Sequence, residues 1–176
     1  MAQSRRILFV AGEVTPFADT SSLASLARFL PVQLQDAGDY EARVMMPCYK
    51  SIDERKHNLH EVIRLSGTDV SVGDNTETLT VKVASIPDVR LQVYFMDHER
   101  YFEREDDSDA SYLEQALFFN RSVLETIRKL RWGPDLVHSF GSISGLVPLL
   151  ISTDYAEDDH LGTTKTVFTQ IGRAHV

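Results

Sequence analysis

The sequence of 176 residues contains a single cysteine, Cys48, and no long apolar run. One thiol cannot form an intrachain disulfide or a cysteine-based zinc site, so a reducing cytoplasm is the expected location. No stretch reaches the roughly 18 consecutive apolar residues of a membrane span, and no membrane is expected as a partner. The apolar run that follows Arg5 and Arg6 is also too short for a signal peptide.

Basic residues are scarce as well. The chain has 18 Lys and Arg against 26 Asp and Glu, which gives a net charge of −8. Nucleic acids and anionic membranes attract a basic surface, so we expect no nucleic acid as a general partner. Because 43% of the residues are hydrophobic, a chain of this length is expected to form one domain with its own core.

Motifs of several common site types are missing. The sequence has no phosphate-binding P-loop, no spaced glycine fingerprint for a dinucleotide and no His-Glu metal motif, so neither a cofactor nor a metal is expected. Ser142 and His138 do not indicate a hydrolase, because no nucleophile elbow surrounds them. The acidic segment 99–111 is predicted to be a solvated loop.

The first part of the chain predicts a βαβ unit. Residues 7–11 form a short continuous apolar run, which is typical of a strand covered on both faces. Apolar residues at helical spacing follow over 23–34, with Ser21 or Ser22 as the N-cap. A second strand is expected at 42–46, and the crossover between the two strands should be right-handed.

The rest of the chain predicts more strands and helices. Short strand-like runs at 62–65, 79–84 and 91–95 are separated by turn residues and indicate an antiparallel insertion. Further elements are expected as a helix over 112–130, a strand over 136–140, a helix over 142–151 and a strand over 166–169. This alternation predicts an α/β fold with a Rossmann-like, doubly wound and mainly parallel sheet that includes an antiparallel excursion.

Two loops are candidates for a ligand site, because such sheets bind ligands at the carboxyl ends of their strands. They are residues 12–22 and residues 138–142. The N–H groups at a helix N-terminus can hold a phosphate, and Thr20, Ser21 and Ser22 would add hydroxyl groups. Helix capping is the commoner use of serine here, and residue types alone favour it by about three to one.

Several segments resemble bacterial glycogen synthases and plant starch synthases, in the same order along the chain. They are ILFVAGEVTPFA from Ile7, RVMMP from Arg43, QVYFMD from Gln92 and RWGPDLVH from Arg131. The similarity runs from Ile7 to Thr169 and is closer still to a short, divergent bacterial branch of glycogen synthases. An alternative interpretation, a nucleotide-sugar enzyme of another class with the same fold, would rest on fold analogy alone.

The resemblance implies that residues 1–169 are the N-terminal catalytic-like domain of a two-domain GT-B glycosyltransferase. Enzymes of this family are retaining hexosyltransferases that move glucose from ADP-glucose to an α-1,4-glucan in glycogen biosynthesis. Its nucleotide and main catalytic charges lie mostly on the second domain, so the missing C-terminal part is an implied partner and no catalytic residue is assigned here. The implied substrate-binding residues are Glu13, Thr20, Ser21, Ser22, His138 and Gly141. Glu13 and His138 are expected to face one cleft.

The donor loop departs from the family pattern Lys-Thr-Gly-Gly-Leu-Ala-Asp. Asp19 replaces the lysine that meets the diphosphate, Ser21 and Ser22 replace the two glycines, and Ser25 replaces the aspartate. Gln115 stands where the family has an arginine. Two charges 4 Å apart interact by ~4 kcal/mol at an effective dielectric of 20, so the reversed charge disfavours an anionic donor. The alternative to an enzyme part is therefore a non-catalytic glucan-binding or regulatory module derived from it.

The end of the chain has a separate explanation. Residues 171–176 are the translation of ATC GGA AGA GCA CAC GTC, a common sequencing adapter. The resemblance stops at Thr169, where the family continues into Ile-His-Asn. We therefore expect that residues 170–176 are an adapter artefact, that they pack poorly, and that the natural protein is longer.

Overall fold

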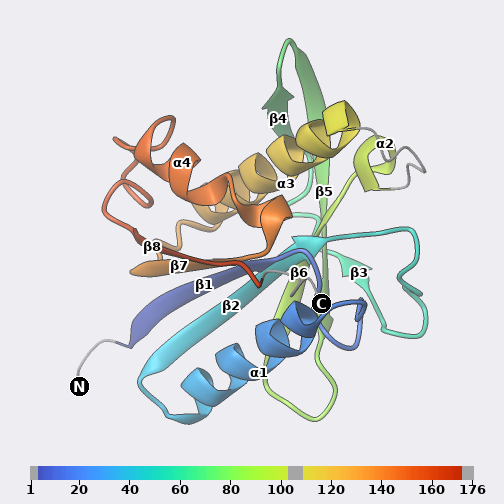
Figure 1. Ribbon diagram of the computed structural model, residues 1–176, viewed down its shortest axis with the longest axis vertical. Helices are drawn as coiled ribbons and strands as arrows, with labels where there is room; N and C mark the ends of the chain where they lie inside the picture. Colours follow the sequence, from blue (N-terminus) through green and yellow to red (C-terminus); the bar gives the residue numbers. More distant parts are fainter. Residues whose placement is uncertain (1–3, 103–108, 172–176) are drawn as a thin grey trace, which may run out of the picture.

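The computed structural model describes residues 4–102 and 109–171, which form an α/β sheet structure (Figure 1). The strands of this sheet are β1 (Arg5–Ala11), β2 (Tyr40–Pro47), β3 (His60–Glu61), β4 (Thr68–Val72), β5 (Asn75–Ser85), β6 (Gln92–Asp97), β7 (Leu136–Phe140) and β8 (Lys165–Thr169). The helices are α1 (Ser22–Asp36), α2 (Glu99–Phe102), α3 (Asp109–Leu130), α4 (Val147–Ser152) and the short 3-10 helix η1 (Ser142–Ser144).

The sheet is mainly parallel, with an antiparallel part at one side. Its order is β3-β5-β6-β2-β1-β7-β8, and β4 pairs with β5 outside this path. Strands β6, β2, β1, β7 and β8 run parallel, whereas β5 is antiparallel to β3, β4 and β6. The predicted fold class is confirmed, including the antiparallel excursion.

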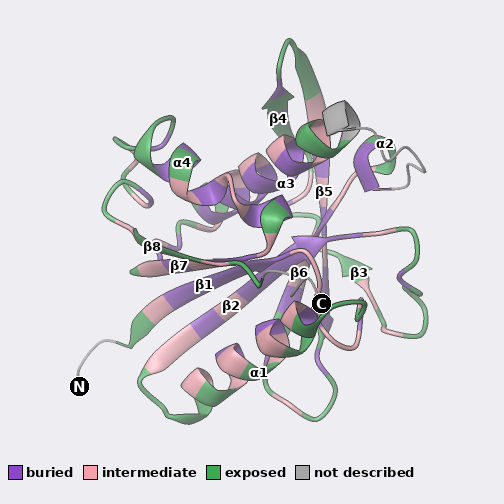
Figure 2. Ribbon diagram, viewed as in Figure 1, coloured by how far each residue is buried: buried purple, intermediate pink, exposed green. Residues whose placement is uncertain are grey.

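Both faces of the central strands are covered by helices. Along β1, Leu8 and Val10 belong to the core under α3 and α4, whereas Phe9 and Ala11 belong to the core under α1. The central strands are accordingly buried along most of their length (Figure 2). Full burial of a large apolar side chain contributes ~1.5–3 kcal/mol, so this two-sided core explains why residues 7–11 carry no polar residue.

The middle of the chain differs in detail from the sequence prediction. The prediction of a strand at 62–65 is wrong, because Val62 donates its N–H to the Val81 carbonyl and the chain then turns. Leu65 is still buried, so its apolar character comes from a packed turn. The strand lies at Thr68–Val72 instead, where it forms a hairpin with β5 through the predicted turn after Val72.

Two further segments correct the sequence prediction. The acidic segment 99–111 is not simply a loop, because Glu99–Phe102 is a helix that buries Tyr101 and Phe102. Residues 103–108 of that segment lie outside the described residues. The single helix expected over 142–151 is divided into η1 and α4, because Gly145 ends the first and α4 starts anew at Val147, with Pro148 in its first turn. Proline lacks an N–H and suits the first turn of a helix.

Strand β8 forms an exposed edge of the sheet. Val167 is 42% exposed and Phe168 is 46% exposed, although both lie in a strand. Of the segment expected to pack poorly, Gln170 and Ile171 are exposed, and 172–176 lie outside the described residues. In the described part of the chain, no helix combines the length and apolar character that a membrane crossing requires.

Candidate functional site

The loop between β1 and α1 is organised around Glu13. Its carboxylate accepts hydrogen bonds from the Thr20 backbone N–H (3.3 Å), the Thr20 hydroxyl and the Ser21 hydroxyl (2.8 Å). Ser21 occupies the N-cap position, as predicted, but makes no side-chain cap hydrogen bond. The predicted capping role of the serine hydroxyl is therefore wrong. Ser22 is the first residue of α1 and is exposed.

Apolar residues fix the same loop to the core. Val14 is fully buried, and the Phe17 ring packs edge-on against Phe95 with 5.0 Å between the ring centroids. The Phe17 N–H donates to the Val14 carbonyl, and the Thr15 N–H donates to the Ala24 carbonyl. These contacts hold the loop against α1 and the sheet, so the carboxylate of Glu13 has a defined place.

The second predicted loop packs against the first one. Gly141 has a φ of 79°, donates its N–H to the Thr169 carbonyl, and would bring a Cβ within 3.3 Å of Leu23 in α1. A Cβ on Gly12 would lie only 2.8 Å from Cγ2 of Ile143. Glycine is therefore required at both positions, because the two loops approach each other closely.

Two tyrosines and a serine complete this edge of the sheet. Tyr49 follows β2, and its hydroxyl lies 3.8 Å from the place of a Gly12 Cβ. Desolvation raises the pKa of Tyr49, and the nearby charge of Glu13 raises it further. Tyr112 on α3 and Ser142 in η1 share a hydrogen bond of 2.6 Å between their hydroxyl oxygens. The sequence analysis did not select either tyrosine; the position of Tyr49 just after a predicted strand was the available signal.

His138 is placed differently from the residues of the two loops. It lies inside β7, opposite Phe9 in the parallel register, and its ring stacks on Phe140 at 4.2 Å. Its Nε2 shares a hydrogen bond of 2.8 Å with the Thr169 hydroxyl, and desolvation lowers the pKa of the imidazole. His138 thus lies in β7, which pairs with β1, and Glu13 lies in the loop after β1, but the ring of His138 is bonded toward β8. This arrangement is that of a packed sheet residue.

The positions that depart from the family pattern lie in the first loop, at the start of α1 and on α3. Asp19 and Ser25 are exposed, and Gln115 is half-buried on α3, one turn after Tyr112. Glu13 and Asp19 place two carboxylates just before the N-terminus of α1, where a helix favours negative charge by ~0.3–1 kcal/mol. Among the residues that the structure describes, no group of three or more His, Cys, Asp or Glu side chains is arranged to hold a metal ion.

Comparison with known proteins identifies the family. Residues 6–170 match the family model of the starch synthase catalytic domain. The chain belongs to this family. It is 42% identical over 172 residues to a glycogen synthase of Chlorobium limicola and 40% identical over 172 residues to one of Chlorobaculum tepidum. Each alignment covers 93% of this chain and 35% of the relative, so the chain spans about a third of these relatives.

A solved structure supports the fold. The catalytic domain of starch synthase IV from Arabidopsis thaliana, bound to ADP and acarbose, matches with a TM-score of 0.80 and 19% sequence identity. The match covers 96% of this chain and 34% of that chain. The starch synthase family member described here therefore has the α/β fold of a GT-B domain, as the resemblance implied.

Proposed function

We propose that this chain forms the acceptor-side wall of a glycogen or starch synthase that moves glucose from ADP-glucose to an α-1,4-glucan. The observation that carries the proposal is the match of residues 6–170 to the starch synthase catalytic domain. The relatives at 40% and 42% identity are glycogen synthases. A cytoplasmic location, where glycogen is made, is part of the same proposal.

The chemistry of the site suits a neutral glucan better than a diphosphate. The Glu13 carboxylate offers about four lone-pair positions, and three donors from Thr20 and Ser21 already use it. The hydroxyls of Tyr49, Tyr112 and Ser142 can each donate or accept, which matches the hydroxyl groups of a sugar. Glu13 and the exposed Asp19 instead oppose the approach of a negatively charged nucleotide.

We also propose that these residues do not catalyse transfer without a second wall. Positioning two substrates together accounts for ~7–11 kcal/mol of an activation barrier, and one domain cannot hold both sides of a cleft. Asp19 would also oppose the negative charge that develops on the diphosphate in the transition state. Replacing Asp19 with lysine corrects only the charge, so it is not expected to restore activity.

The test measures transfer of labelled glucose from ADP-glucose to glycogen by the purified chain. No turnover above a heat-killed control is expected for the wild type or for Asp19→Lys. Turnover that is abolished by Glu13→Ala would contradict the proposed inactivity.

Retention of the chain in a gel containing glycogen tests the acceptor site, and Glu13→Ala should weaken this retention. Glu157→Ala, which removes an exposed carboxylate outside both loops, is the matched control.

The second candidate is a non-catalytic glucan-binding or regulatory module derived from the enzyme. It is favoured by the altered donor-loop positions Asp19, Ser21, Ser22 and Ser25 and by Gln115 on α3. The gene sequence beyond codon 169 distinguishes the two. A second Rossmann-like domain with a Glu-x7-Glu pattern and an Arg/Lys pair would favour the enzyme, whereas a stop codon shortly afterwards would favour the module.

A further inference from the structure

A cavity opens at the end of the sheet opposite the candidate site. Its volume is about 370 Å³, and it lies where the start of β2 separates from the start of β6. The register between these strands begins at Val44 and Val93, so residues 40–43 have no ladder partner on the β6 side. Its lining residues are Gln35, Tyr40, Glu41, Ala42, Arg43, Arg90, Leu91, Gln92 and Tyr94.

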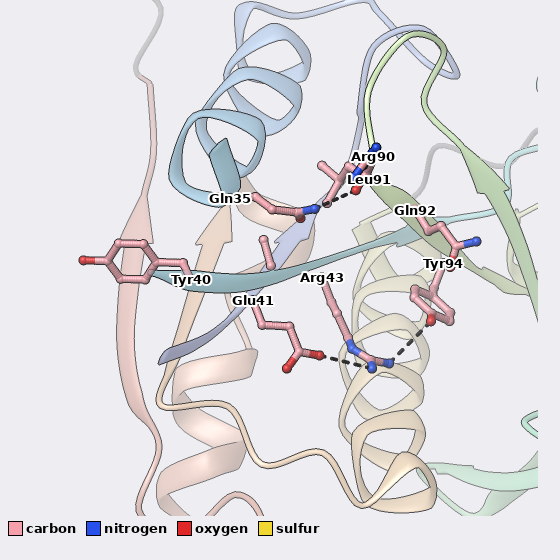
Figure 3. Close-up of a pocket in the computed structure, with 9 residues that line it drawn as sticks. Gln35, Tyr40, Glu41, Arg43, Arg90, Leu91, Gln92 and Tyr94 are labelled. Carbon is pink, nitrogen blue, oxygen red and sulfur yellow. Dashed lines mark hydrogen bonds and ion pairs between the residues drawn. The ribbon is translucent and has the colours of Figure 1, made fainter. Parts of the chain in front are cut away.

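The side chains divide between the two faces of β2. Figure 3 shows Gln35 and Arg90 on one side of the strand and Glu41, Arg43 and Tyr94 on the other. Gln35 donates its amide N–H to the Arg90 carbonyl at 2.7 Å and so closes the first side. Arg90 on that side is exposed, whereas Glu41, Arg43 and Tyr94 on the other side are half-buried and lie within the cavity.

Arg43 is held in place by aromatic rings, not by strong ion pairs. The carbon of its guanidinium group lies 4.7 Å from the centre of the Trp132 ring and 5.9 Å from that of Tyr94. Its hydrogen bonds to the Tyr94 hydroxyl and to Glu41 are both long, at 3.4 Å. A guanidinium carries five N–H donors, so most of its donor capacity is unused. Ring stacking also fixes the plane of the group in advance.

Glu41 does not neutralise this arginine by itself. Its carboxylate also accepts the indole N–H of Trp132 at 2.8 Å and lies 3.5 Å from Nε of Arg6. Two arginines thus share the carboxylate of Glu41, and a second carboxylate, that of Asp135, accepts the backbone N–H of Arg6 at 2.7 Å. If Arg43 turned to another anion, Glu41 would keep the contacts with Trp132 and Arg6.

We propose that this cavity binds the oxyanion group of a small metabolite, a phosphate or a carboxylate, through Arg43. Two N–H groups of the guanidinium would donate to two oxygens of the anion, the geometry that arginine favours with such groups. The volume falls within the ~300–1,000 Å³ of small-molecule sites, so the ligand can be larger than the anion itself. The site is remote from Glu13 and does not depend on the proposed glucosyl transfer.

The chain carries its own probe for this site, because Trp132 is the only tryptophan. The experiment titrates the full chain with inorganic phosphate, glycerol phosphate and citrate at constant ionic strength, and follows tryptophan fluorescence and calorimetric heat. Saturable binding of at least one probe is expected, and the comparison of the three distinguishes free phosphate, phosphate ester and carboxylate. Absence of saturable heat and fluorescence change with all three would overturn the proposal.

Two substitutions in the cluster should act in opposite directions. Arg43→Gln removes the charged donor and should weaken anion binding by about tenfold or more, as expected for a charge-assisted hydrogen bond. Glu41→Gln keeps an acceptor for Trp132 but removes the competing charge, so it should tighten binding. Arg55→Gln, at an exposed site outside the cavity, should leave binding unchanged.

The opposite changes in anion affinity distinguish the proposal from simple loss of folding, which would weaken anion binding in both variants. Unchanged or stronger binding of the anions with Arg43→Gln would show that Arg43 does not hold them, and it would refute the proposal. Saturable binding of neutral maltotriose at Trp132, without binding of any anion, would refute it as well.

Discussion

Ser21 donates its hydroxyl hydrogen to Glu13 across 2.8 Å, although it occupies the N-cap position of α1. A serine at this position normally accepts a hydrogen bond from a helix N–H instead. The carboxylate after β1 therefore connects directly to the start of α1, and the beginning of the helix depends on Glu13. Thr20 reinforces this connection through its backbone N–H and its hydroxyl.

This relationship predicts an unusual effect of Ser21→Asp. Aspartate and serine are about equally good N-caps, so the exchange is nearly neutral in an ordinary helix. Here it replaces a donor to Glu13 with a second carboxylate, so the lost hydrogen bond and the repulsion should lower the free energy of unfolding by ~0.5–2 kcal/mol. The measurement is urea denaturation of the variant and the wild type.

The matched control for this prediction is Ser22→Asp, one residue further along. Ser22 is exposed in the first turn of α1 and makes no hydrogen bond to Glu13. A negative charge in the first turn is neutral to slightly stabilising, by up to ~1 kcal/mol. Equal stability of both variants, or a more stable Ser21→Asp protein, would contradict the assigned role of Ser21.

His138 predicts a pH dependence of stability. Desolvation among Phe9, Phe140 and Thr169 lowers its pKa in the folded protein, whereas the unfolded value is about 6.5. Above pH 6.5 the imidazole is neutral in both states. As the pH falls below that value, the unfolded chain takes up the proton first, so the contribution of His138 to the free energy of unfolding is lost.

The measurement compares wild type with His138→Gln, because the chain has five other histidines and the difference isolates His138. The difference between the two free energies of unfolding should change below pH 6.5 and stay constant above it. Parallel curves over the whole range, or an NMR titration that places the pKa of His138 at or above 6.5, would argue against this role.

The sequence predicted the central fold because its strands are buried on both faces. Residues 7–11 are a short apolar run and 136–140 a short, mostly apolar segment interrupted by His138 and Ser139; both are bounded by loops, and β1 and β7 lie there. Strand β4 was missed because only Val70 and Val72 point to the core and polar residues separate them. Periodicity over five residues with one buried face is too weak a signal, and the packed turn around Leu65 resembled a strand more closely.

The candidate site was predictable only in part. Glu13, Thr20 and Ser21 lie close together in the sequence, so a loop argument placed them in one group. Tyr49 follows β2 and Tyr112 lies on α3, and only the folded sheet brings them near Glu13 and Ser142. Conversely, His138 was expected to face the cleft, but within the predicted strand 136–140 its ring stacks on Phe140 and bonds to Thr169 of β8.

The close approach of the two site loops predicts the effect of Gly12→Ala. The new methyl group would lie 2.8 Å from Cγ2 of Ile143, a side chain that is only 8% exposed and cannot simply move away. Either η1 or the end of β1 must shift, at a cost of ~1–3 kcal/mol in the free energy of unfolding.

Relief of this contact should reveal the coupling between the loops. Ile143→Ala alone removes buried methyl groups and costs ~2–5 kcal/mol, but it also opens the space that the methyl group on residue 12 needs. The double variant should therefore be more stable than the sum of the two single effects, by ~0.5–3 kcal/mol in a double-mutant cycle. Glycogen retention should fall in Gly12→Ala and recover in part in the double variant, because a displaced η1 moves Ser142 away from Tyr112. Strict additivity of the unfolding free energies would mean that the loops do not touch in solution, and the shared site would then lose its structural basis.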